Sequence, residues 1–186
     1  MRILLIDRQP ELVNAWIEAM PDCEAICGDI LEHEVDAVVS PGNSFGFMDG
    51  GIDLAYSTKF GWEVQTRVQR AIRETFDGEL LVGRALIVPT GDPDIPHVIA
   101  APTMRVPMQI ADPSAVRLAT RAAVRAASRA GLETIAMPGM GTGAGLVKFS
   151  WAARMMAAGI ADALGPKQFP KSFSVAQDDH FKTYPR

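Results

Sequence analysis

Two patterns of hydrophobic residues alternate along this chain. Short aliphatic runs are typical of strands buried on both faces of a sheet, and they occupy residues 3–6, 24–27, 36–40, 85–88, 98–101 and 134–137. Between them, apolar residues recur every three or four positions, as in amphipathic helices, at residues 10–20, from about 52, and at 61–76, 112–131 and 147–164. Asp112 is a natural N-cap, and Gly131 stands where that helix must end.

This order predicts an α/β fold. Strands that alternate with helices form a mixed, mostly parallel central sheet with helices on both faces, a three-layer α/β/α sandwich. The 186 residues suit one domain and show no internal repeat or linker. We therefore expect a single domain over residues 1–186, with its core in about 1–165 and a tail, 166–186, whose structure the pattern does not predict.

The composition of the chain argues against several classes of function. Eighteen basic and 22 acidic residues give a net charge of −4, which argues against a dedicated nucleic-acid binder. It does not exclude a small anion, because backbone amides and helix ends can hold phosphate. The three histidines are scattered, so we predict no metal site and no cofactor. No apolar run is long enough for a signal peptide or a membrane span, so we expect a cytoplasmic protein without membrane contact.

Three polar or glycine-rich segments follow strands: Gly28-Asp29, Pro41 to Gly51, and Pro138 to Gly145. In open α/β sheets, ligands bind in the crevice beyond the carboxyl ends of the strands. Because these three segments would meet at that edge, they predict one ligand site.

The first glycine loop runs from Pro41 to Asp53 and enters a helix at about Ile52. Its glycines allow the backbone to approach a ligand and turn N–H groups toward an anion. Asn43 and Asp53 bracket the loop and could bind the same ligand. The alternative is a structural connection, with Asn43 in a turn and Asp53 at the start of a helix.

The second loop, Pro138 to Gly145, carries alternating glycines before a helix. It lacks the Gly-Lys-Ser/Thr order of a Walker A loop. It also lies after the wrong strand for a dinucleotide fingerprint. Alone, it is equally consistent with a tight strand-to-helix turn.

Taken together, these segments resemble the macrodomain family from Gly28 to about Leu164. Gly28-Asp29-Ile30 is similar to the family's Gly-Asp-Ile/Leu signature, and residues 38–43 are similar to its V-N-A-A-N strand end. The family has an Asp ten residues after the second Asn, within Gly-Gly-Val/Ile-Asp. Here Asp53 follows Asn43 by ten residues, within Gly50-Gly51-Ile52-Asp53. Thr142-Gly143 matches the Thr-Gly of the family's diphosphate loop.

The resemblance implies a ligand and a reaction. The partner would be ADP-ribose or an ADP-ribosylated substrate, with nucleic acid a partner only if it carries the modification. Asp29 would take the adenine amino group, Asn43 would fix the distal ribose, and Asp53 would orient or deprotonate the ribose or water. Asn43 and Asp53 are thus the candidate catalytic residues. The expected ligand-binding residues are Asp29, Ile30, Asn43, Gly50, Gly51, Ile52, Gly141, Thr142, Gly143, Ala144 and Gly145.

The resemblance implies release of ADP-ribose by hydrolysis from a protein side chain, a nucleobase or an acetyl ester. A non-catalytic ADP-ribose reader is the second hypothesis, and an unrelated nucleotide-binding α/β protein is the third. The sequence does not indicate the linkage or the oligomeric state.

The chain departs from the family pattern in three places. Ser40 replaces the first Asn, and Pro41-Gly42 replace two alanines. Gly145 stands where many members have an aromatic residue over the distal ribose, so we expect Gly145→Phe or Gly145→Tyr to tighten ADP-ribose binding. The adenine-stacking Phe of the family has no clear counterpart, and the candidates in the tail are Phe173, Phe181 and Tyr184.

Other basic residues could also meet an anion. Lys59 follows the first loop and could pair with a phosphate or an acid, although an exposed lysine is the simpler interpretation. Four arginines spaced four apart share one face of the helix after Asp112. That face could bind a polyanion or, as we favour, face solvent, and its members are Arg117, Arg121, Arg125 and Arg129.

Overall fold

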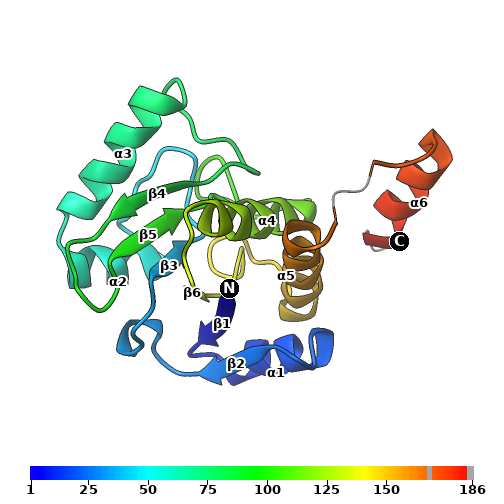
Figure 1. Cartoon of the computed structure of the whole chain (residues 1–186), viewed down its shortest axis with the longest axis horizontal. Helices are drawn as coiled ribbons and strands as arrows, with labels where there is room; N and C mark the ends of the chain where they lie inside the picture. Colours follow the sequence, from blue (N-terminus) through cyan, green and yellow to red (C-terminus); the bar gives the residue numbers. More distant parts are fainter. Residues whose placement is uncertain (167–168, 184–186) are drawn as a thin grey trace.

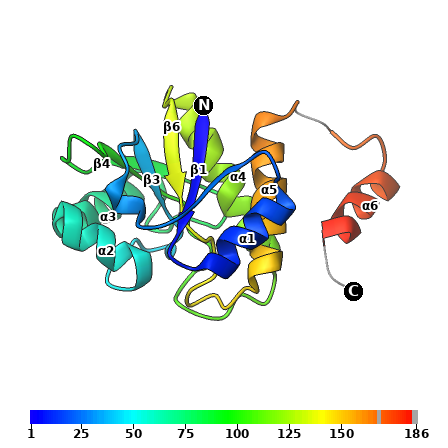
Figure 2. The same cartoon turned by 90° about the horizontal axis from the view of Figure 1, so that it is seen from below.

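The computed structural model describes residues 1–166 and 169–183. It confirms the predicted α/β class: a six-stranded sheet, ordered β2-β1-β6-β3-β5-β4, lies between two layers of helices in the described residues (Figures 1 and 2). All neighbouring strands are parallel except β4, which runs antiparallel to β5 at one edge. The strands are β1 (Arg2–Asp7), β2 (Glu24–Cys27), β3 (Ala37–Ser40), β4 (Leu86–Pro89), β5 (His97–Ala100) and β6 (Thr134–Met137).

Helices cover both faces of the sheet (Figure 2). One face packs on α2 (Gly51–Phe60) and α3 (Glu63–Thr75). The other packs on α1 (Pro10–Ala19), α4 (Ser114–Arg129) and α5 (Phe149–Leu164). Successive strand residues point to opposite faces of the sheet. In β1, Leu4 and Ile6 therefore pack in the core beneath α2 and α3, while Leu5 packs in the core beneath α1, α4 and α5. Burial on both faces explains why these strands are short aliphatic runs.

Two helix starts differ slightly from the sequence prediction. Helix α4 begins at Ser114, and Asp112 accepts a hydrogen bond from the Ser114 amide at 2.8 Å in the preceding turn. Helix α5 begins at Phe149, because the chain is still in the second glycine loop at Leu146, whose φ is +51°. Gly131 leaves α4 with φ +73°, as expected for a helix exit.

The tail contains a helix that the hydrophobic pattern did not predict. Helix α6 (Phe173–Thr183) lies beyond α5 in both views (Figures 1 and 2). Phe173 and Phe181 are more than half exposed, so α6 lacks the buried apolar stripe on which periodicity depends. An ion pair at 3.6 Å joins its Asp179 to Arg117 of α4.

The arginine face of α4 is not a solvated outer surface along its whole length. Arg117 donates two hydrogen bonds to Asp162 of α5, at 2.7 and 3.0 Å, and Arg125 donates to the Asp162 carbonyl at 2.9 Å. These contacts tie α4 to α5, so two of the four arginines are committed within the protein. No helix in the described residues has the length and apolar character needed to cross a membrane.

Candidate functional site

A cavity of about 470 Å³ opens at the carboxyl ends of β1, β2, β3 and β6. Because these strands are parallel, the loops that follow them meet at one edge of the sheet. The structure brings every predicted site residue to the wall of this cavity: Asp29, Ile30, Asn43, Gly50, Gly51, Ile52, Asp53, Gly141, Thr142, Gly143, Ala144 and Gly145.

Asp29 stands at the end of β2 and caps the short 3₁₀ helix η1 (Ile30–Glu32). Its Oδ1 accepts a hydrogen bond from the Leu31 amide at 3.0 Å, and its Oδ2 pairs with the Arg8 guanidinium. The Leu31 amide and then Arg8 lower the pKa of this carboxyl. Asp29 is therefore a carboxylate at neutral pH, with lone pairs left for a donor from a ligand.

Asn43 organises its own loop. Its Oδ1 accepts from the amides of Phe45 and Phe47 at 3.1 and 3.3 Å, and its Nδ2 donates to the Phe47 carbonyl at 2.9 Å. One N–H of the side-chain amide remains for a ligand. The turn interpretation of Asn43 is therefore correct, and it is compatible with a ligand contact.

Asp53 is the buried acid of the site. It is the third residue of α2, and only 5% of its surface is exposed. Burial raises its pKa to about 7, against an opposing effect of Ser40. The N-cap of α2 is Gly50, which has no side chain, and Asp53 is the acidic residue of the first turn. Its Oδ1 is buried without a hydrogen-bond partner in the described structure, which suits a group reserved for chemistry.

Backbone N–H groups supply the positive side of the cavity. Helix α2 points its uncapped N-terminus, at Gly50 and Gly51, into the cavity wall. In the second loop, the amides of residues 142–145 donate no hydrogen bond within the described part of the chain. Arg8 is the one Lys or Arg among the described lining residues. An anion here would therefore be held mainly by backbone donors and by the dipole of α2.

Gly145 does not have room for a side chain. It is buried, and a Cβ there would overlap the Gly141 carbonyl oxygen and lie 2.7 Å from Ile110 Cδ1. The expectation that an aromatic residue at position 145 would tighten ligand binding is therefore wrong for this loop, because the obstacle is backbone.

Gly145→Ala should instead destabilise the protein by about 1–3 kcal/mol, the usual cost of overpacking. Gly143→Ala is the matched control, because a Cβ on Gly143 meets nothing within 4 Å. Urea unfolding of the two variants measures the difference. Equal stability of both variants would show that the loop relaxes freely around position 145.

Sequence reasoning missed the loop after β1. Asp7 Oδ2 accepts a hydrogen bond from the Gly139 amide at 3.2 Å and so links this loop to the second glycine loop. Arg8 lines the cavity and pairs with Asp29. Asp7 ends a strand just as Asp29 follows one, so the strand-end rule could have identified it. The pairing of Arg8 had no local signal, because its partner lies 21 residues away.

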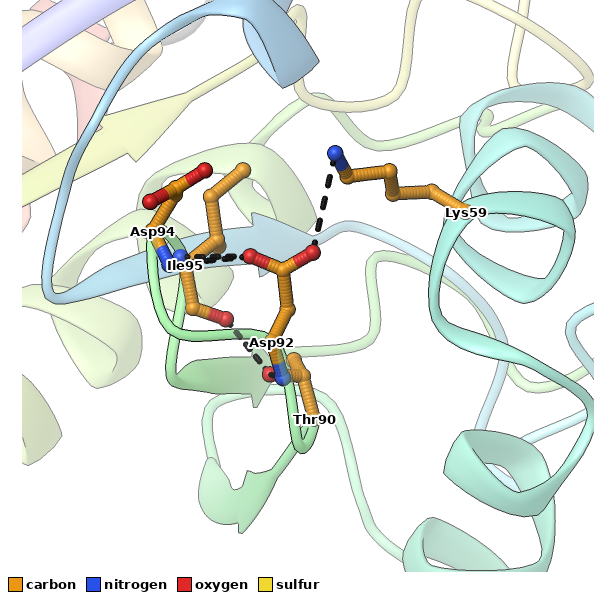
Figure 3. A network of polar contacts seen from close by, with 5 residues as sticks. All are labelled: Lys59, Thr90, Asp92, Asp94 and Ile95. Atoms are coloured by element: carbon orange, nitrogen blue, oxygen red, sulfur yellow. Dashed lines mark hydrogen bonds and ion pairs between the residues drawn. The ribbon is translucent and has the colours of Figure 1, made fainter.

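Lys59 lies away from this cavity. It stands in the last turn of α2, and its Nζ is 3.6 Å from Asp92 Oδ2 (Figure 3). Asp92 also accepts from the amides of Asp94 and Ile95 at 2.9 and 3.2 Å, within the loop between β4 and β5. Lys59 therefore meets an acid and not a ligand phosphate.

Two of the three aromatic candidates of the tail are not at the site. Phe173 and Phe181 of α6 are absent from the cavity wall, and Tyr184 lies outside the described residues. No cluster of three or more His, Cys, Asp or Glu suited to a metal occurs within residues 1–166 and 169–183.

Comparisons with known proteins agree with this architecture. The Macro domain family model matches residues 39–156, more than half of the chain. An uncharacterized protein of Aquifex aeolicus is 35% identical over 135 residues, which cover 73% of this chain and 78% of that protein. An uncharacterized protein of Aeropyrum pernix is 36% identical over 150 residues, which cover 75% and 72%.

Solved structures share the fold at lower identity. The macrodomain of Mycobacterium tuberculosis DarG superposes with a TM-score of 0.62 at 23% identity, covering 74% of this chain and 88% of that one. The Oceanobacillus iheyensis macrodomain with ADP has a TM-score of 0.59 at 19% identity, with 71% and 72% covered. Thermosipho africanus DarTG in complex with ADP-ribose has a TM-score of 0.61 at 14% identity, with 86% of this chain and 49% of that one covered. On the family match and the two relatives above one-third identity, this chain belongs to the macrodomain family.

Proposed function

We propose that this macrodomain binds ADP-ribose and hydrolyses an ADP-ribosyl linkage to a protein side chain, a nucleobase or an acetyl ester. The observation that carries the proposal is the row of unpaired amides at residues 142–145 in the same cavity as the uncapped start of α2. Two such donor sets suit a diphosphate, which needs several hydrogen bonds along its length. Bound ADP and ADP-ribose in solved relatives of the same fold support this ligand.

Asp29 and Asp53 would contact the two ends of the ligand, on either side of the diphosphate. Asp29 is ionised and lies at the end of β2, where it can accept a hydrogen bond from the exocyclic amino group of adenine. Asp53 and Asn43 flank the first glycine loop, and there they would meet the distal ribose. The diphosphate would lie between, across the amides of the second loop and the N-terminus of α2.

For a linkage at the anomeric carbon of the distal ribose, hydrolysis needs a water oxygen to bond to that carbon while its bond to the carrier breaks. For an acetyl ester, the water oxygen would instead bond to the ester carbonyl carbon while the bond from that carbon to the ribose oxygen breaks. The attacking water loses a proton, and the leaving group gains one. Asp53 has a pKa of about 7, so a large fraction is carboxylate at neutral pH and can accept the proton from water. A base whose pKa lies near the working pH is the most effective one. The amides would position the ligand for this attack.

A reader module without turnover is the second candidate. The commitment of the Asn43 side chain to its own loop favours it. Calorimetry with ADP-ribose tests binding. Release of ADP-ribose from modified proteins, modified nucleic acids and acetyl-ADP-ribose tests turnover. Tight binding with no release from any of these substrates would leave only the reader.

Asp29→Ala should weaken ADP-ribose binding by about 1.5–3 kcal/mol, the range for a hydrogen bond to a charged group. Glu32→Ala is the matched control, because it removes an exposed acid from the same 3₁₀ turn. Calorimetry measures both, and a melting curve separates the lost cap of η1 from the lost ligand contact. Equal affinity of the wild type for ADP-ribose and its guanine counterpart would contradict this role of Asp29.

A further inference from the structure

The carboxyl group of Asp53 occupies space that a side chain at position 42 would fill. A Cβ built on Gly42 would overlap Asp53 Oδ2 and would lie 3.5 Å from Asp53 Cγ and from Ser40 Oγ. The backbone of Gly42 is not in the left-handed region. Position 42 therefore requires glycine for room and not for its backbone conformation.

Ser40 borders the same space. It is the last residue of β3, and only 4% of its surface is exposed. Its side chain favours the charged form of Asp53. Behind these groups lies a second, small cavity of about 10 Å³, lined in part by Ser40, Gly42, Met48 and Asp53. This volume is at most the size of one water molecule. The carboxyl group therefore cannot move far back into the protein.

We propose that Ser40 and Gly42 are positioning residues for Asp53: the hydroxyl at position 40 and the missing Cβ at position 42 together form a seat that holds its carboxyl group in the wall of the ligand cavity. One oxygen, Oδ2, rests in the seat, while Oδ1 is left without a partner. Residues 40 and 42 are also two of the positions at which the chain departs from the family's Asn and Ala. Ala at position 42 would remove the space that Oδ2 occupies.

Ser40 is the side chain that favours the charged form of Asp53, and the neighbouring ionisable group on α2 does not add to this stabilisation. The ionisable side chain that faces Asp53 on α2 is Tyr56, which is fully buried and donates a hydrogen bond to the Val39 carbonyl at 3.1 Å. Burial and the negative charge of Asp53 keep the pKa of Tyr56 well above its usual value, so it remains neutral. Ser40 is then the side chain that stabilises the carboxylate, and Gly42 is the position that keeps it buried.

These two roles predict opposite effects on the same group. Ser40→Ala removes the hydroxyl that favours the charged form of Asp53, so the pKa of Asp53 should rise by about one unit or more. Gly42→Ala expels the carboxyl group toward the open cavity, so its pKa should fall by about one unit or more as burial is relieved. Carbon-13 NMR titration of the Asp53 carboxyl measures both in the free protein, with Asp53→Asn used to assign the resonance.

Matched controls are available for each substitution. Ser57→Ala removes a buried hydroxyl that donates to the Met48 carbonyl at 2.8 Å, one turn along α2 from Asp53. Gly28→Ala adds a Cβ that meets only Ile26 Cγ2, at 3.9 Å. Neither control should move the pKa of Asp53 by more than a few tenths of a unit. A shift of that size is what a change in packing alone would produce. Shifts of the same sign in Ser40→Ala and Gly42→Ala, or no shift in either, would overturn the proposal.

A double-mutant cycle keeps the test decisive if Gly42→Ala is too unstable to titrate. The cost of Gly42→Ala in urea unfolding should be large in the wild type and largely lost in an Asp53→Ala background, where no carboxyl group occupies the seat. An equal cost in both backgrounds would refute the seat. The proposal rests on the proposed function only for its catalytic meaning, because both measurements use the free protein. If the chain proves to have no turnover, the titrations and the cycle still decide whether the seat exists.

Discussion

Asp53→Ala should lower the rate of ADP-ribose release by roughly 10²–10⁴-fold, the contribution of a positioned acid or base. ADP-ribose affinity should change far less, since the amides of residues 142–145 and the carboxylate of Asp29 are untouched. Single-turnover release, with calorimetry on the same samples, measures both quantities. Asn43→Ala should damage binding and release together, because its side chain also holds the loop from 43 to 47.

The competing explanation for Asp53 is a purely structural one. A residue that only stabilised the start of α2 would cost about 1 kcal/mol of stability when removed and would leave turnover nearly intact. A melting curve on Asp53→Ala separates these cases. If stability falls and release is unchanged, Asp53 is not a catalytic group.

Asp53→Asn should make the protein more stable than the wild type at pH 8, while the two should be close near pH 4. In the folded protein the pKa of Asp53 is about 7, raised by burial from its ordinary 3.8. Between these values the folded chain keeps a proton that the unfolded chain has released. The free energy of unfolding of the wild type therefore falls as pH rises from about 4 to about 7, and it is level above pH 7. The total fall due to Asp53 is about 4 kcal/mol.

Urea unfolding of both proteins from pH 4 to pH 9 measures this effect, because the contributions of all other groups cancel in the difference. Asp49→Asn, which removes an exposed acid from the same loop, controls for the change in net charge. If the stability difference between wild type and Asp53→Asn stays constant with pH, folding does not raise the pKa of Asp53.

The architecture could be predicted from the sequence because it depends on local periodicity. Aliphatic runs such as Val38-Val39 must be buried on both faces, and that requirement produces a parallel sheet between two helix layers. The location of the site follows from the same fact, since parallel strands bring the segments after them to one edge. Asp29, Asn43, Asp53 and the second glycine loop were therefore identifiable before any coordinates, although their ligand roles stay predictions.

What only the tertiary structure decided is how these residues are paired and buried. The pairing of Arg8 with Asp29, of Lys59 with Asp92 and of Arg117 with Asp162 joins residues 21 to 45 positions apart, and no local pattern encodes such distances. The crowding at Gly145 depends on how its own loop folds back onto Gly141. The burial of Asp53 against Gly42 and Ser40 likewise arises only when the end of β3 packs on the start of α2. Contacts of this kind set the pKa of a group and the room around it, and these are properties of the packed chain and not of its hydrophobic pattern.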